Sequence, residues 1–136
     1  MQIRSRLSQA GMLGAAAVAA LAFSAGPASA APAVAASPAS GLSNGQTVTV
    51  TGTGFPAGSE VAVSQCREAT TCTDSLTRAT VGANGSFSAQ YSVRKSFTAT
   101  DWSTGSTVTV DCGAQQCQLV AYLEATGAVG TNISFG

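Results

Sequence analysis

The 136-residue sequence contains no histidine, and only 9% of its residues carry a charge. The missing imidazole excludes Ser-His-Asp and Cys-His nucleophile arrangements, and it excludes zinc sites with histidine ligands. The six carboxylates are scattered singly, without the local pair that glycoside hydrolysis uses. No glycine-rich phosphate loop opens a helix. The sequence therefore predicts neither catalytic residues nor a metal site, and we do not expect an enzyme.

Cationic side chains are also scarce. Residues 31–136 contain four of them against six carboxylates, which gives a net charge of −2. A surface with so little positive charge has no electrostatic footprint for tight nucleic-acid binding. Arg94 and Lys95 are adjacent, but this pair is more typical of a solvated hairpin end than of a contact with phosphate.

The first thirty residues have the three parts of a secretory signal peptide. A start with two arginines precedes an apolar run at residues 12–23, and a small-x-small cleavage motif follows at residues 28–30. The apolar run is too short for a stable transmembrane span, and no other segment is expected to cross a membrane. We therefore expect a secreted protein with a signal peptide at 1–30 and a single domain at 31–136. The alternative is an uncleaved amphipathic helix.

After residue 30 no stretch of useful length has the helical period, and Thr, Val, Gly, Ser and Ala dominate. Thr and Val favour strands, whereas Gly and Ser favour turns. Turn signals recur roughly every eight to twelve residues, which indicates an all-β, immunoglobulin-like sandwich of about seven strands. The expected strands are an edge strand at 31–36 and further strands at 46–53, 59–66, 75–81, 86–93, 107–112, 117–123 and 131–136.

A polar break that begins with glycine separates residues 107–112 from residues 117–123. Apolar and polar residues alternate strictly in the first of these segments, which is the period of a half-buried strand. Two strands joined by such a break predict a β-hairpin, and we expect the fold to be arranged around it. The preceding segment 98–106, which contains Trp102, is expected to be irregular.

All four cysteines lie in the predicted mature domain. In a secreted chain we expect them to form disulfides and not catalytic thiolates. Four cysteines allow three pairings. The local pairing, Cys66 with Cys72 and Cys112 with Cys117, needs only two short loops, each contributing roughly 2 kcal/mol in the chain-entropy model.

Six segments spread over almost all of residues 31–136 carry a further signal: 37–50 (SPASGLSNGQTVTV), 65–66 (QC), 83–85 (ANG), 93–97 (VRKSF), 110–117 (VDC to C) and 133–136 (ISFG). In this order and at this spacing they resemble the neocarzinostatin family of enediyne chromoprotein apoproteins. Each segment alone is a weak signal, but together with four cysteines and a signal peptide they are specific.

The resemblance implies a seven-stranded immunoglobulin-like β-sandwich with a small lobe of loop and ribbon, and it implies the two local disulfides. It also implies a monomeric, secreted carrier that holds a labile enediyne chromophore non-covalently in a cleft beside that lobe. Such a carrier protects and releases the chromophore, which then cuts DNA. The protein would be antibacterial and cytotoxic when loaded, with DNA only as the target of the ligand and with no other cofactor.

The resemblance also suggests which side chains line the cleft. Trp102 falls at the position of a cleft aromatic, Leu76 at that of a phenylalanine, and Gln118 at that of a glutamine. Val120 and Tyr122 fall at positions on the cleft floor. The full predicted ligand-binding set is Gln65, Leu76, Trp102, Gln118, Val120 and Tyr122.

Each of these residues also has a purely structural interpretation. Trp102 would be half-packed on the sheet, Leu76 would belong to the core, and Tyr122 would be an ordinary strand residue. Gln65 and Gln118 would satisfy backbone groups near the disulfides.

Two departures from the family pattern favour a second function. The loop from Cys66 to Cys72 is short and contains no large apolar residue. Val120 and Tyr122 are bulkier than the small residues that a family relative has at these positions, so the cleft is expected to be shallower. The alternative is a secreted immunoglobulin-like module without a ligand, which contacts proteins or a cell surface.

Overall fold

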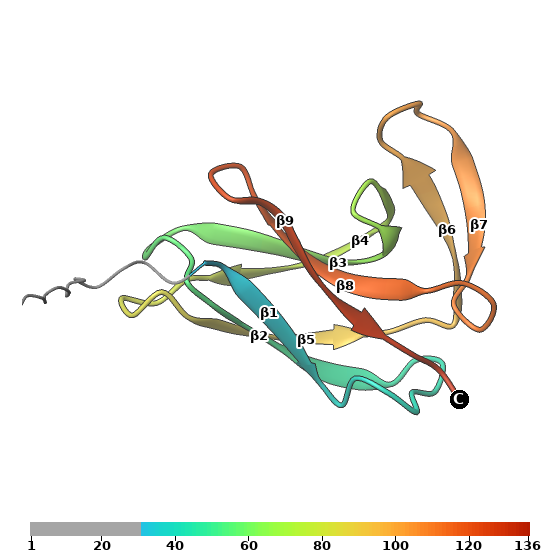
Figure 1. Cartoon of the computed structure of the whole chain (residues 1–136), viewed down its shortest axis with the longest axis horizontal. Coiled ribbons are helices and arrows are strands. Elements are labelled where there is room, and N and C mark those ends of the chain that lie inside the picture. The colour runs from blue at the N-terminus through green and yellow to red at the C-terminus, as the bar shows by residue number, and fades with distance from the viewer. Residues whose placement is uncertain (1–30) are drawn as a thin grey trace, which may run out of the picture. The chain divides into compact units, whose positions relative to one another are not determined.

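The computed structural model describes residues 31–136, and all of its regular secondary structure is β (Figure 1). None of these residues forms a helix long and apolar enough to cross a membrane. The predicted signal peptide, residues 1–30, lies outside the described part of the chain. The nine strands are β1 (Ala33–Ser37), β2 (Thr47–Thr53), β3 (Glu60–Glu68), β4 (Thr71–Thr80), β5 (Phe87–Ser92), β6 (Ser96–Asp101), β7 (Thr107–Asp111), β8 (Cys117–Leu123) and β9 (Gly127–Ile133).

Seven of the strands form a sandwich. One layer is the sheet β1-β2-β5, and the other consists of β4, β3, β8 and β9, as Figure 1 shows. The second sheet continues past β4 into β6 and β7, which form a two-stranded ribbon. The ribbon joins β4 at only two register pairs, Thr71 with Asp101 and Cys72 with Thr100. The expected seven-stranded sandwich with a small ribbon lobe is therefore confirmed.

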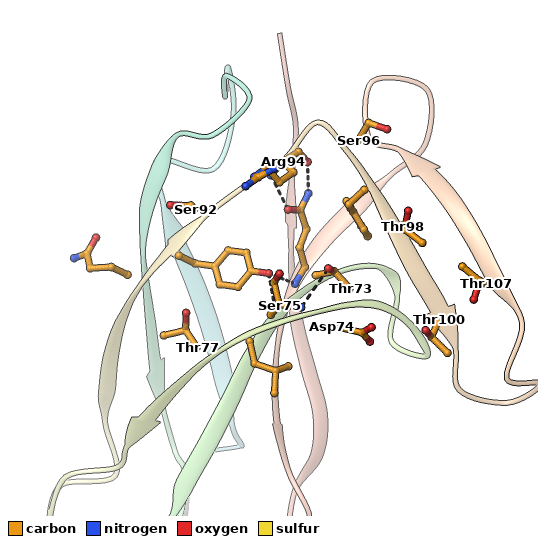
Figure 2. A pocket seen from close by; sticks show the side chains of 15 residues that line it. Thr73, Asp74, Ser75, Thr77, Ser92, Arg94, Ser96, Thr98, Thr100 and Thr107 are labelled. Carbon is orange, nitrogen blue, oxygen red and sulfur yellow. Dashed lines mark hydrogen bonds between the residues drawn. The ribbon is translucent and has the colours of Figure 1, made fainter.

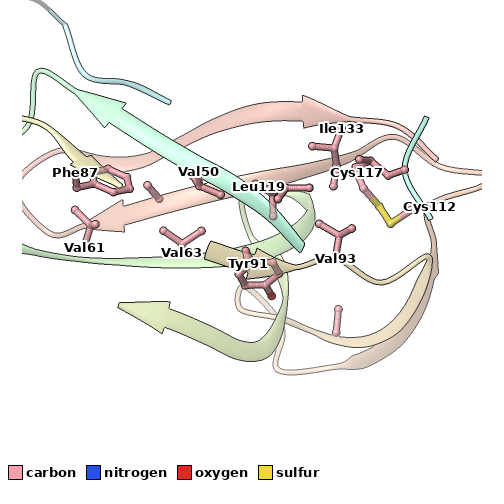
Figure 3. Close-up of a cluster of buried hydrophobic side chains, with 14 of the residues drawn as sticks. Val50, Val61, Val63, Phe87, Tyr91, Val93, Cys112, Cys117, Leu119 and Ile133 are labelled. Atoms are coloured by element: carbon pink, nitrogen blue, oxygen red, sulfur yellow. A yellow bond between two sulfur atoms is a disulfide. The ribbon is translucent and has the colours of Figure 1, made fainter. Parts of the chain in front are cut away.

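The core lies between the two layers and follows the alternation of the sequence. In β5 the aromatic and aliphatic residues point inward, and in β2 every second residue does the same. Figure 3 shows these side chains packed against β3 and β8. The ring of Phe55 lies edge-to-face on Phe87 at a centroid distance of 5.3 Å. The turn before β5 ends at Gly85, whose φ of 83° and close approach to the Phe55 backbone both require glycine.

The predicted hairpin between residues 107–112 and 117–123 is wrong. β7 pairs with β6, whereas β8 lies between β3 and β9. Alternation identifies a strand but not its partner. Leu119 and Ala121 are buried in the core and Val120 is buried on the opposite face, which suits the interior position of β8 between β3 and β9. The break between the two segments turns the chain from the ribbon into the sandwich.

Two further expectations need correction. The segment 98–106 is not irregular throughout, because β6 runs to Asp101 and only the following turn lacks regular structure. Phe97 and Ala99 form the inward face of β6. The middle of this strand consists of alanine and threonine, which give only a weak alternation signal in the sequence. The last strand begins at Gly127 and ends at Ile133, earlier than the expected 131–136.

The disulfides are Cys66–Cys72 and Cys112–Cys117, and the described residues contain no free cysteine. This is the local pairing that the family resemblance implies. The first bond crosses the β3–β4 hairpin beside its turn. The second closes the turn that leads from the ribbon into β8.

Candidate functional site

The sandwich sheet that contains β8 has an outer face, which points away from β1, β2 and β5. Strand register builds a row across this face, in which Leu76 of β4 lies opposite Ser64 of β3, Ser64 opposite Val120 of β8, and Val120 opposite Gly130 of β9. The neighbours of Ser64 and Val120 along their strands point into the core, so this row points outward.

Two parallel rows complete the outer face. On one side lie Arg78, Ala62, Tyr122 and Ala128, and on the other lie Cys72, Cys66, Gln118 and Asn132. The structure thus brings four of the six predicted ligand-binding residues to one face: Leu76, Gln118, Val120 and Tyr122.

The shape of the outer face depends on the sizes of its side chains. Leu76 and Tyr122 are 45% and 42% exposed, although both are large and apolar. The residues between them on β3 are small, Ala62 and Ser64. The backbones of β4 and β8 are two strand spacings apart, about 10 Å. A strip of small side chains therefore runs along β3 with a larger apolar side chain on each flank.

Val120 fills the middle of the outer face. Its side chain is buried in a small cluster with the Cys66–Cys72 disulfide. A Cβ atom at Gly130, the neighbour on β9, would lie 2.6 Å from Gln118 Oε1 and 3.3 Å from Val120 Cγ2. Gln118 and Val120 therefore already occupy the space above Gly130, and a larger residue there would have to displace the end of the Gln118 side chain.

Trp102 lies at the tip of the ribbon and is 52% exposed. Its backbone N–H donates to the Thr70 carbonyl at 2.9 Å, which ties the tip to the β3–β4 turn. The Asp101 carboxylate accepts hydrogen bonds from the hydroxyl and the N–H of Ser103, at 2.6 and 2.9 Å, and these bonds hold the pKa of Asp101 below its usual value. Figure 1 shows the ribbon extending beyond the sandwich on the side of β3 and β4.

Gln65 lies on the opposite face of β3 and is 1% exposed. Its Nε2 donates to the Arg94 carbonyl at 2.7 Å, and its Oε1 accepts from the Arg94 N–H at 2.8 Å. The same Nε2 lies 3.3 Å from Cys112 Sγ. The amide is fully engaged with the chain, which fits the structural interpretation of this residue.

A separate pocket of about 670 Å³ opens between β4, β5 and β6 (Figure 2). Of the predicted ligand-binding residues only Gln65 and Leu76 contribute to its lining. Most of the lining consists of serine and threonine. Only four of these residues, Ser75, Thr77, Ser92 and Thr107, fall in expected strands, and none was predicted to belong to a site. Within residues 31–136 no group of three or more potential metal ligands is found.

Comparison with known proteins places this architecture. The model of the neocarzinostatin family matches residues 34–135. Macromomycin from Streptomyces macromomyceticus is 42% identical over 93 residues, which cover 57% of this chain and 62% of macromomycin, less than two thirds of its length. The antitumor antibiotic C-1027 apoprotein from Streptomyces globisporus is 36% identical over 128 residues, which cover 89% of this chain and 90% of the relative.

Solved structures give the same result. The structure of macromomycin superposes with a TM-score of 0.70 at 35% identity and covers 78% of this chain and all of its own. Apokedarcidin superposes with a TM-score of 0.58 at 30% identity and covers 79% of this chain and all of its own. Since the family model covers most of the chain and the C-1027 apoprotein matches along nearly its whole length, this protein belongs to the neocarzinostatin family.

Proposed function

We propose that the protein is a secreted carrier that binds, protects and releases a small-molecule chromophore of the enediyne type. One observation carries the proposal. The large apolar side chains left exposed within residues 31–136 are Leu76, Trp102 and Tyr122, and all three belong to the predicted ligand-binding set. A relative named as the apoprotein of an antitumor antibiotic supports the same role.

The outer face offers a flat ligand two kinds of contact. The ring of Tyr122 supplies a surface for stacking, Leu76 supplies an aliphatic flank, and Trp102 would add a second ring from the tip of the ribbon. Gln118 supplies an amide that can donate and accept hydrogen bonds. The protein contributes binding and shielding from water, while cleavage of DNA is the chemistry of the released ligand. The loaded protein would thereby act as an antibiotic without an enzymatic step of its own.

Val120 limits how deeply the ligand enters. Because Val120 and Gln118 fill the space above Gly130, the ligand would lie along the strip of small residues on β3 and not sink into the sheet. We therefore propose a shallow seat bounded by Leu76 and Tyr122, with Trp102 closing it from the ribbon.

The proposed route out of the cell rests on two features. Residues 1–30 have the signal-peptide pattern, and the remaining chain contains two disulfides, which persist in oxidising compartments. We infer cleavage after Ala30 and a mature monomer of residues 31–136.

The filled face also supports a second candidate function. The β3–β4 turn carries no large apolar side chain, and Val120 closes the centre of the face. A secreted module of this shape without a small-molecule ligand would use the outer face to contact another protein or a cell surface.

A fluorescence titration separates the two functions. Trp102 is the single tryptophan, so its emission can be followed during titration with 1-pyrenemethanol, a flat, neutral polycyclic alcohol. We expect saturable quenching at micromolar concentrations. Tyr122→Ala should weaken binding roughly two- to twelve-fold through the lost stacking contact, whereas Tyr122→Phe keeps the ring and should bind like the wild type.

Two further variants sharpen this test. Val120→Gly opens the centre of the face and should bind the probe more tightly. Thr51→Ala, on the outer face of the other sheet, should change nothing. If Trp102 emission shows no saturable response in the wild type or in Val120→Gly, the module without a ligand is the correct function.

A further inference from the structure

The pocket between the two sheets opens at the free edge of β4 and shares only Leu76 with the rows that define the outer face. β4 pairs with β6 only at its first two residues, so the edge of β4 from Thr73 to Thr80 has no strand partner in the described chain. β5 is the edge strand of the opposite sheet. The pocket of about 670 Å³ lies at this opening and is bounded by β4, β5 and the ribbon, as Figure 2 shows. Its volume falls in the range of small-molecule sites, roughly 300–1,000 Å³.

The floor of the pocket is fixed by buried hydrogen bonds. The Tyr91 hydroxyl donates to the Ser75 carbonyl at 2.8 Å and accepts from the Gln65 N–H at 3.1 Å. The Gln65 amide in turn holds both backbone groups of Arg94. These bonds join β3, β4 and the end of β5 around one buried phenol. The floor is therefore formed before any ligand arrives, which limits the entropy lost on binding.

The walls of the pocket are made largely of hydroxyl groups. Eight of the lining residues are serine or threonine: Thr73, Ser75, Thr77, Ser92, Ser96, Thr98, Thr100 and Thr107. One carboxylate, Asp74, and one guanidinium, Arg94, add charges that cancel. A carboxylate offers two acceptor atoms and a guanidinium a fork of donors, and each hydroxyl both donates and accepts.

We propose that this pocket, which we call the inter-sheet pocket, binds a neutral polyhydroxylated molecule such as a saccharide. Adjacent hydroxyls of a sugar match the two oxygens of Asp74 and the donor fork of Arg94, and the serine and threonine hydroxyls supply further partners. A net charge on the ligand would be attracted by one of these two groups and repelled by the other, so the pocket does not select for either sign.

Other ligand classes fit the pocket less well. A flat aromatic molecule would find no open ring to stack on, because Tyr91 is 5% exposed and Phe97 is packed against the core. An extended peptide added to the free edge of β4 would compete for the Ser75 carbonyl, which already accepts from Tyr91. The inter-sheet pocket therefore favours a compact polar ligand.

Amide resonances of the ¹⁵N-labelled protein test the proposal. Cellobiose, maltose and trehalose serve as neutral probes, and glucuronate and glucosamine as charged ones. We expect saturable shifts with at least one neutral disaccharide, confined to amides such as Ser75, Thr98 and Thr100. The charged probes should bind more weakly.

A matched pair of variants locates the site. Thr98→Val combined with Thr100→Val removes two hydroxyls and keeps the side-chain shape, so the affinity should fall about five-fold or more. Thr109→Val is the control, because Thr109 lies directly opposite Thr98 on β7 but does not line the pocket. The absence of saturable shifts with all three disaccharides would overturn the proposal. So would shifts confined to outer-face residues that do not line the pocket, such as Gln118 and Tyr122, or an affinity that the double variant leaves unchanged.

Discussion

At the scale of single residues, the hydroxyl of Tyr91 is a polar group that two hydrogen bonds hold inside the fold. It lies beneath the inter-sheet pocket and holds the Ser75 carbonyl and the Gln65 N–H together. Burial raises the pKa of Tyr91 above its ordinary value of 10.0, and the Gln65 hydrogen bond and the Arg94 charge offset this only in part. The folded protein therefore prefers the protonated phenol more strongly than the unfolded chain does.

Tyr91→Phe should cost about 1–2 kcal/mol of unfolding free energy at neutral pH, because the buried Gln65 N–H loses its partner. The variant should also change the pH dependence. In the wild type, the stability that comes from this group is complete below pH 10 and is lost as the pH rises through the higher folded-state pKa. Urea unfolding between pH 7 and 11 measures both effects.

Tyr122→Phe is the control for that experiment, because it removes a different phenol and leaves the buried Tyr91 hydroxyl in place. An equally steep alkaline loss of stability in Tyr91→Phe and the wild type would show that another group causes it.

Predictions about single residues were correct where they depended on the alternation of apolar and polar residues along a strand. The burial of β5 side chains follows directly from the period of its sequence. The hydrogen-bond partners of Gln65 could not be predicted from alternation. Its side-chain amide bonds to the backbone of Arg94, which is distant in the chain and has no periodic relation to Gln65. The inter-sheet pocket was missed for the same reason, since it unites polar residues of five separate strands.

At the scale of elements, strand positions were largely predictable and strand partners were not. Residues 107–112 and 117–123 both form strands, but they pair with β6 and with β3 and β9. Whether a strand has buried apolar residues on one face or on both indicates whether it lies at the edge or in the interior of the sheet. β8 has buried residues on both faces and lies between two strands, whereas β7 is half-exposed and forms an edge.

The two disulfides act on different elements. Replacing Cys112 and Cys117 by serine should lower the unfolding free energy by roughly 2 kcal/mol, the loop-entropy contribution of so short a ring. The melting temperature should therefore fall by several degrees. Thermal unfolding followed by circular dichroism measures the change.

Replacing Cys66 and Cys72 should have a similar thermal cost, and it should also weaken binding at the outer face, because Val120 packs on this disulfide. The Cys112 and Cys117 variant is the matched control for that second effect. An unchanged melting temperature in both variants would mean that the loops are held by the strands alone.

At the scale of the whole molecule, the family and the layered architecture were predictable from the sequence, because several short segments occur in a fixed order. The shape of the outer face was not, since it depends on which residues of β3, β4, β8 and β9 are in register. The register also explains why Val120 alone fills the centre of the outer face, since it places this residue between Ser64 and Gly130.

Native mass spectrometry of the secreted protein should give the mass of residues 31–136 less four hydrogens, one pair for each disulfide. We expect a monomer, because the edge strand β1 is only five residues long and is flanked by prolines. A loaded carrier would add a mass that leaves on denaturation. A larger mass that includes residues 1–30 would contradict the proposed cleavage after Ala30. A stable dimer would contradict the proposed monomer.

The pairing of β3 with β8 also has a kinetic consequence. These strands lie side by side in the sheet, but all of β4 to β7 separates them along the chain. Contacts between distant segments form late, and sandwiches dominated by them fold in milliseconds to seconds. The outer face straddles β3 and β8, so it does not exist in any early hairpin. A nascent chain therefore cannot form the proposed ligand-binding face until its final strands have been synthesised and docked.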